Sequence, residues 1–143
     1  MSRVAQHNGD DHAEAAGKHL VDSRTLANAG GADGAAYLAG YVVECCLKTL
    51  VLVASGAVAQ VHSLNDLTSE ALRLAALPGS RTVRYAPRQT PGHALYDRAH
   101  GWRPALRYRP PGHIAPAVAA AWLAEAELVY VSTIVTMRLD GVV

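Results

Sequence analysis

The stretch AAYLAGYVVECCLK, residues 35–48, restricts the possible folds of this chain more than any other feature. It is apolar or small at almost every position, so a helix formed by it would be buried around most of its circumference. It nevertheless carries one carboxylate and one ammonium group. At 3.6 residues per turn, the polar and aromatic residues of the stretch share one face and form a single stripe: Tyr37, Tyr41, Glu44 and Lys48.

Glu44 requires a partner if this polar stripe is buried, because an unpaired charge away from water is costly. Lys48 is the simplest partner, since it follows one turn later in the favourable order for a Glu–Lys pair. An arginine from a distant part of the chain would be the alternative partner. A local pair on an exposed helix surface would explain the same spacing equally well.

The composition favours an all-α fold with one core. The 143 residues fit a single domain, half of them are hydrophobic, and phenylalanine is absent, so Ala, Leu and Val must form most of the core. We expect a flexible N-terminal arm at residues 1–11 and a single helical domain at residues 12–143. Hydrophobic periodicity predicts four helices, and these cover residues 12–28, 35–54, 64–76 and 116–139.

Local signals define several ends of these helices. Gly56 is suited to end the second helix, since glycine readily adopts the left-handed conformation found at helix C-termini. Ser63 and Asp66 have the spacing of an acidic capping box at the start of the third helix. Pro116 suits the first turn of the last helix, where a missing N–H costs nothing.

Cysteine usage and hydropathy predict a cytoplasmic protein without a membrane span. Cys45 and Cys46 are the only cysteines, and adjacent side chains on a helix point about 100° apart, so they cannot bridge each other. The sequence does not begin with a signal peptide. The apolar run at 49–61 is too short to cross a bilayer, and glutamates interrupt the run at 114–137. The histidines lack metal-ligand spacing, so we expect neither a metal nor another cofactor.

The segment 81–113 is strongly basic, although the whole chain has a formal charge of only +1. It contains seven arginines and one acidic residue, Asp97, which together give +6. Arginines hold phosphates and aromatic rings stack on bases, so the segment predicts binding of single-stranded RNA or a nucleotide. A solvated loop that keeps an apolar protein soluble is the alternative. The residues expected to contact nucleic acid are Arg88, Trp102, Arg103, Tyr108 and Arg109.

Residues 35–48, followed by VHSL at 61–64, GWRPALRY at 101–108 and a long last helix, resemble the HEPN domain family in content and order. The resemblance implies an antiparallel bundle of four to five helices that forms a homodimer, here with a long basic Pro/Arg-rich loop before the last helix. Many members of the family are metal-independent endoribonucleases of toxin–antitoxin or defence systems. Others are noncatalytic modules that partner a minimal nucleotidyltransferase encoded nearby.

Catalytic members of this family carry an Arg, then four to six residues, then a His, close to the last helix. Arg107 and His113 have this spacing, and the resemblance therefore implies that they form the catalytic pair. His113 would transfer a proton and Arg107 would hold the scissile phosphate while the RNA 2′-hydroxyl attacks. Arg88 and His93 satisfy the same spacing and are the rival pair.

Overall fold

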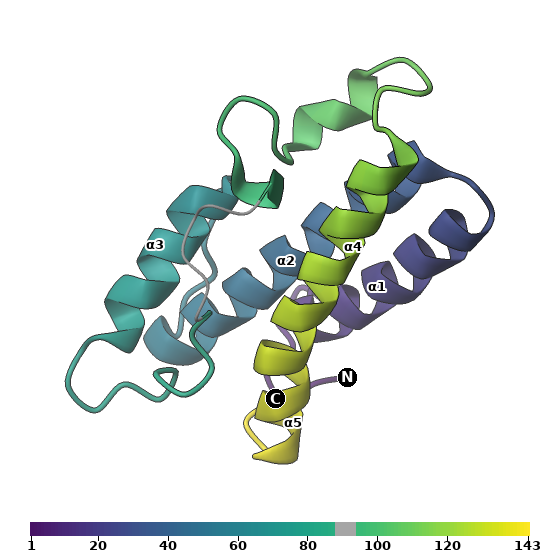
Figure 1. The fold of residues 1–143 in the computed structure, drawn as a ribbon. Helices are drawn as coiled ribbons and strands as arrows, with labels where there is room; N and C mark the ends of the chain where they lie inside the picture. Colours follow the sequence, from purple (N-terminus) through teal and green to yellow (C-terminus); the bar gives the residue numbers. More distant parts are fainter. Residues whose placement is uncertain (88–93) are drawn as a thin grey trace.

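The chain is described by a computed structural model, which covers residues 1–87 and 94–143. Within these residues the secondary structure is helical and contains no strand, so the all-α prediction is confirmed. The four main helices, drawn in Figure 1, are α1 (His12–Asn28), α2 (Ala32–Ser55), α3 (Leu64–Ala75) and α4 (Pro116–Tyr130).

The last helix is longer than α4 alone. It continues through a π-helical turn, η3 (Val131–Val135), into a final turn, α5 (Thr136–Leu139). Its extent agrees with the single helix predicted over 116–139, whereas the π-helical turn was not predicted. Two short 3-10 helices, η1 (Ala94–Tyr96) and η2 (Pro104–Tyr108), lie between α3 and α4.

The predicted local signals define the helix ends. The Ser63 hydroxyl accepts a hydrogen bond from the Asp66 N–H at 3.3 Å and thereby caps α3. Gly56 follows α2 with φ of +75°, a conformation in which a side chain would be strained. Pro116 is the first residue of α4. The short-range chemistry of the sequence therefore sets where these helices begin and end.

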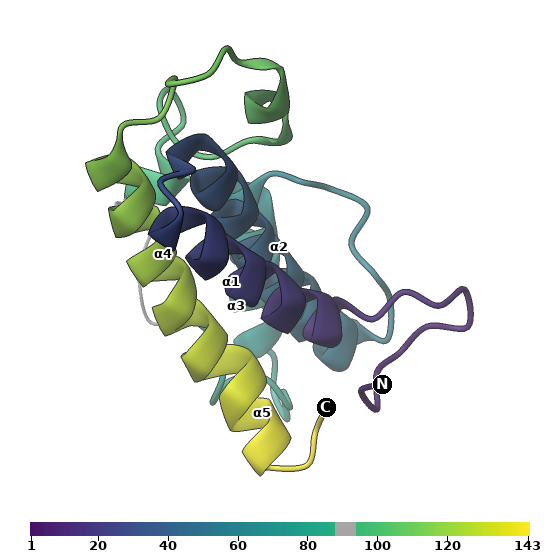
Figure 2. The same ribbon diagram turned by 90° about the vertical axis from the view of Figure 1, so that its right-hand side faces the viewer.

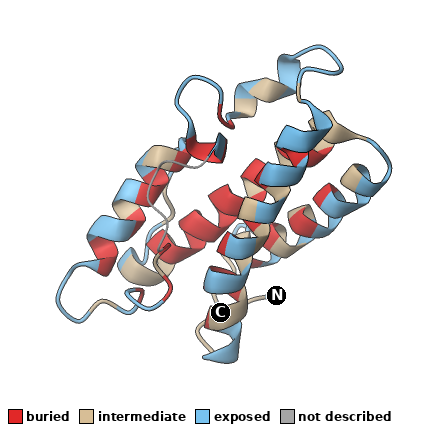
Figure 3. Ribbon diagram, in the orientation of Figure 1, coloured by how far each residue is buried: buried red, intermediate tan, exposed pale blue. Residues whose placement is uncertain are grey.

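Helix α2 lies at the centre of the fold, and α1, α3 and α4 all pack against it (Figures 1 and 2). Buried positions follow α2 along most of its length in Figure 3. Small residues such as Ala36 and Ala39 are fully buried and allow the neighbouring helices to approach closely. Leu67 from α3 and Trp122 from α4 complete the core around α2.

Residues 1–11, expected to form a flexible arm, contact both the start of α1 and the C-terminus. The Ser2 N–H donates to Asp11 Oδ2 at 2.7 Å, and the Ser2 hydroxyl donates to Asp11 Oδ1 at 2.8 Å. The Arg3 guanidinium donates to the Gly141 carbonyl at 2.5 Å. The two ends of the chain therefore lie close together, as Figure 2 also shows.

Among residues 1–87 and 94–143, two helices are long and apolar enough to cross a membrane by length and composition: Ala32–Ser55 and Pro116–Leu139. Within the most apolar window of each, 72% of the first and 33% of the second is buried inside the protein. Core helices of soluble proteins have the same properties, so the absence of a membrane span stays a prediction. The last helix leaves large apolar side chains exposed, including Val118, Leu128 and Val131.

Candidate nucleic-acid interface

The polar stripe of α2 contains two tyrosines that contact each other. The hydroxyls of Tyr37 and Tyr41 lie 3.2 Å apart, and their rings meet edge to face. Burial, together with the hydrogen bond to Tyr37, raises the pKa of the Tyr41 hydroxyl to about 12. His19 from α1 lies beside the Tyr41 ring, with 5.6 Å between the ring centroids. This end of the stripe is therefore a half-buried aromatic cluster of neutral side chains.

The charged end of the stripe is a buried ion pair. Lys48 Nζ lies 3.0 Å from Glu44 Oε1, and the two side chains are only 8% and 5% exposed. The Nδ1 atom of His62 lies 2.9 Å from the same carboxylate oxygen, and the His62 side chain is 59% exposed. Among the described residues, Glu44 thus forms an ion pair with Lys48 and a hydrogen bond with His62, and neither partner is an arginine. Of the two predicted partners, the simpler one, Lys48, is observed.

Trp102, rather than an arginine, attaches the basic segment to α2. Its ring lies directly on Gly40, so closely that a methyl group added at this glycine would overlap the indole. Its Nε1–H donates to the Tyr37 carbonyl at 2.8 Å, and the Tyr41 ring meets it edge on at 5.0 Å. Trp102 is 6% exposed. The prediction that this ring stacks on a base is therefore corrected, because neighbouring atoms already cover it.

Tyr108 and Arg107 lie on the surface at the end of η2. Tyr108 is 76% exposed, and the guanidinium carbon of Arg107 lies 4.8 Å from its ring centroid. Interaction with Tyr108 and, to a smaller extent, with Tyr37 raises the pKa of Arg107 above its ordinary value. The Tyr108 ring is thus exposed, and Arg107 packs against it; the contact of Tyr108 with nucleic acid stays a prediction.

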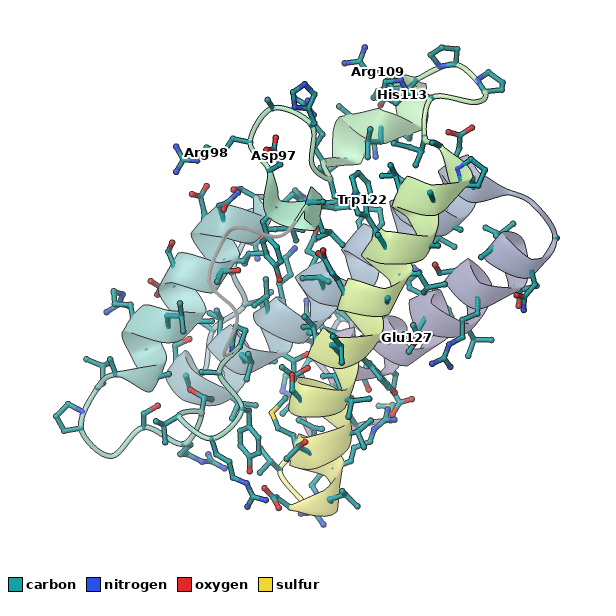
Figure 4. All side chains as sticks on the ribbon, viewed as in Figure 1. Asp97, Arg98, Arg109, His113, Trp122 and Glu127 are labelled. Atoms are coloured by element: carbon teal, nitrogen blue, oxygen red, sulfur yellow. The ribbon has the colours of Figure 1, made fainter. Side chains whose placement is uncertain are left out.

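Two of the arginines expected to contact nucleic acid, Arg103 and Arg109, line a groove of about 480 Å³, here called the arginine groove. Arg88, also expected there, lies outside the described residues. Arg103 and Arg109 contribute guanidinium groups, and His100 and His113 contribute imidazoles. No carboxylate belongs to the described residues that line it. Figure 4 shows Arg109 and His113 at the same end of the molecule. Arg107, the proposed catalytic partner of His113, is not one of the lining residues.

Asp33, in the first turn of α2, fixes the loop that carries His113. Its two carboxylate oxygens accept the N–H of Gly112 at 2.6 Å and the N–H of Ile114 at 2.7 Å. These backbone hydrogen bonds, Ile114 first, lower the pKa of Asp33. The sequence reasoning missed this role, because an acidic residue in a first helical turn already has a local explanation in the helix dipole.

A second groove of about 430 Å³, here called the α3 groove, lies between the start of α3 and the segment 95–104. One side of the α3 groove is lined by His62, Asn65 and Asp66, and the opposite side is lined by Asp97, Arg98 and Arg103. The carboxylate of Asp97 is already hydrogen-bonded within the segment, since its Oδ1 accepts the backbone N–H groups of Ala99 and His100. Gly101 and Arg103 line both grooves, so the two grooves adjoin.

The sequence did not predict a role for His62 beyond its place in the VHSL motif at 61–64. In the structure it immediately precedes Ser63, the residue that caps α3. No motif spacing could link it to Glu44, 18 residues earlier. The rival pair, Arg88 and His93, lies outside the described residues.

The described residues include no group of three or more His, Cys, Asp or Glu side chains that could hold a metal ion. No family model, no curated protein and no solved structure matches this chain. The HEPN resemblance therefore remains a hypothesis from the sequence motifs. An assignment of function has to start from the geometry of the two grooves.

Proposed function

We propose that this chain is a HEPN-like helical bundle that binds RNA or a nucleotide through the arginine groove and cleaves RNA without a metal ion. The observation that carries the proposal is the make-up of that groove. Two guanidiniums and two imidazoles share one concave surface, and no carboxylate is present among its described lining residues. Such a site favours phosphate, because each bound phosphate displaces counterions and accepts charge-assisted hydrogen bonds.

The surroundings of the arginine groove suit a single strand. Arg103 donates to the Ala99 carbonyl at 2.6 Å, which restricts the guanidinium before a ligand arrives. The exposed ring of Tyr108 is available to a base that is not paired in a duplex. A single-stranded RNA could therefore place phosphates on Arg103 and Arg109 and a base on Tyr108.

Cleavage would use the RNA 2′-hydroxyl as the nucleophile, so the protein would supply only proton transfer and charge stabilisation. The family resemblance assigns these roles to His113 and Arg107, brought together in a homodimer. The exposed apolar side chains of the last helix, among them Leu128 and Val131, would provide the surface for that dimer. Light scattering over a range of micromolar concentrations should then give twice the 15.1 kDa mass of one chain.

Fluorescence anisotropy with a labelled single-stranded RNA tests binding. Arg103→Ala and Arg109→Ala should each weaken binding and lower the slope of log affinity against log salt by about 0.7. Arg73→Ala is the matched control, since Arg73 is an exposed arginine on α3 that pairs with Glu70. Equal affinities for all three variants, or a wild-type affinity that does not depend on salt, would refute the proposed binding site.

The alternative function is a noncatalytic module that partners a nucleotidyltransferase encoded nearby. One observation favours this alternative: the Arg107 guanidinium packs over the Tyr108 ring, and Arg107 is not among the residues that line the arginine groove with His113. Co-expression with a neighbouring nucleotidyltransferase should then yield a stable complex, and the isolated chain should leave RNA intact. Cleavage by the isolated chain in the presence of a chelator would exclude the noncatalytic alternative.

A further inference from the structure

His62 and Glu44 form a carboxylate–imidazole pair at the edge of the α3 groove. Glu44 Oε1 accepts from Lys48 Nζ at 3.0 Å, since an ammonium group can only donate, and His62 Nδ1 at 2.9 Å from the same oxygen is the second donor. The proton on Nδ1 leaves the lone pair of the neutral ring on Nε2. Because 59% of the His62 side chain is exposed and the residue lines the groove, this imidazole is accessible to a ligand.

The support of this imidazole is rigid. Glu44 is 5% exposed and lies within the central helix α2, and Lys48, one turn later, holds the same carboxylate oxygen at 3.0 Å. On its other side, His62 is followed by Ser63, the residue that caps α3. A buried carboxylate behind an accessible imidazole fixes the orientation and the tautomer of the ring, as a positioned general base requires. His113 differs, because its loop is fixed through backbone N–H groups that donate to Asp33.

Charged groups of both signs line the α3 groove together with His62. The guanidiniums are those of Arg98 and Arg103, and the carboxylates are those of Asp66 and Asp97. The N-terminus of α3 also lines the groove, and its dipole favours an anion. Arg103 belongs to the arginine groove as well. A strand bound along the arginine groove can therefore continue past Arg103 towards His62.

We propose that His62, positioned by Glu44, takes the proton in RNA cleavage by this chain, in place of His113, to which the family resemblance assigns that role. The inference rests on the proposed function. His62 Nε2 accepts the proton of a ribose 2′-hydroxyl while the 2′-oxygen forms a bond to the adjacent phosphorus. The bond from phosphorus to the 5′-oxygen breaks, and the departing oxygen takes a proton from water. The products are a 2′,3′-cyclic phosphate and a 5′-hydroxyl end, and the imidazolium returns its proton to solvent.

Cleavage of a labelled oligoribonucleotide by the full chain, with a chelator present, tests this assignment. His62→Asn keeps an amide N–H that can donate to Glu44 but removes the titrating ring. It should bind RNA as tightly as the wild type and cleave it at least about 100-fold more slowly. His7→Asn is the matched control, since His7 is an exposed histidine that lines neither groove, and it should keep the wild-type cleavage rate. Wild-type cleavage by His62→Asn, or loss of cleavage only in His113→Asn, would overturn the assignment.

Two measurements keep the proposal testable if His62→Asn does not fold. Modification of wild-type His62 by diethyl pyrocarbonate, mapped by mass spectrometry, should slow when the oligoribonucleotide is bound, and an unchanged rate would count against the site. Glu44→Gln should lower kcat and leave KM close to the wild-type value, because the amide can donate to Nδ1 and favour the tautomer that carries its proton on Nε2. A wild-type kcat for Glu44→Gln would refute the positioning role of Glu44.

The failure of this proposal can be told apart from failure of the proposed function. If the wild type and His62→Asn bind and cleave RNA equally well, the role of His62 is refuted while the proposed function stands. If the wild type binds RNA in a salt-dependent way but leaves it intact, both cleavage and the role of His62 are refuted, and RNA binding stands. If the wild type does not bind RNA at low salt, the proposed function and the role of His62 are both refuted.

Discussion

Replacing Gly40 by alanine should displace Trp102 and weaken the attachment of the basic segment to the helical core. Gly40 lies in the middle of α2, and the Trp102 indole covers it so closely that an added methyl group would overlap the ring. The backbone of a central helix cannot move away without disturbing the other helices that pack on it. We therefore expect the indole of Trp102 to move instead, with loss of its hydrogen bond to the Tyr37 carbonyl.

The expected cost follows from what Trp102 loses. Removing a buried aromatic side chain from its site costs about 3–5 kcal/mol, and Trp102 is 6% exposed. The lost hydrogen bond adds about 1 kcal/mol. Alanine in place of glycine within a helix stabilises the folded state by about 1 kcal/mol, which offsets part of this loss. Partial repacking of the ring reduces the total, so the free energy of unfolding should fall by about 2–4 kcal/mol.

Urea denaturation followed by circular dichroism would measure this loss, and tryptophan emission would report the exposure of the indole by a shift to longer wavelength. Gly34→Ala is the matched control on the same helix. Its added methyl group would lie 2.9 Å from Leu26 Cδ1, the end of a side chain that can rotate away. The control should be neutral or stabilising. Equal denaturation midpoints for the two variants, with unchanged emission, would show that Trp102 does not depend on the space at Gly40.

Three further predictions concern buried groups. Glu44→Ala should lower the free energy of unfolding by about 3–5 kcal/mol, since it leaves a buried Lys48 without its partner; a loss below about 1 kcal/mol in urea denaturation would contradict the buried pair. Burial raises the pKa of the Cys45 and Cys46 thiols to about 12, so a thiol reagent should modify them only after unfolding, and rapid modification of the native protein would argue otherwise. Burial lowers the pKa of two α1 histidines, His12 and His19, below 6.5, so on acidification the unfolded state takes up these protons at a higher pH than the folded state does. The free energy of unfolding should therefore be constant above about pH 7 and fall as the pH drops from 6.5 towards 5. Replacing both histidines by glutamine should flatten that decline, and an unchanged pH dependence would refute this cause.

Features that depend on neighbouring residues could be predicted from the sequence. The Ser63 cap of α3 and the start of α4 at Pro116 arise from hydrogen bonds and steric effects within one helical turn. The Glu44–Lys48 pair follows from the four-residue spacing, which brings side chains together on any α-helix. The central position of α2 follows from its apolar circumference.

The composition of the site could not be predicted in the same way. Trp102 and Tyr108 are aromatic residues of one basic segment, yet one is buried against α2 and the other is exposed. Arg103 lines the same groove as His113, whereas Arg107, nearer in sequence, does not. Local periodicity carries no information on these outcomes, because they depend on where the segment contacts the packed helices.

The sequence by itself therefore determined an all-α chain, the ends of several helices and a charged pair within its most apolar helix. Only the tertiary structure decided that His62 contacts Glu44 and that Trp102 lies on Gly40. The physical reason is the range of the interactions. Helix formation and capping depend on contacts within a few residues, whereas the grooves form where segments far apart in the sequence pack together.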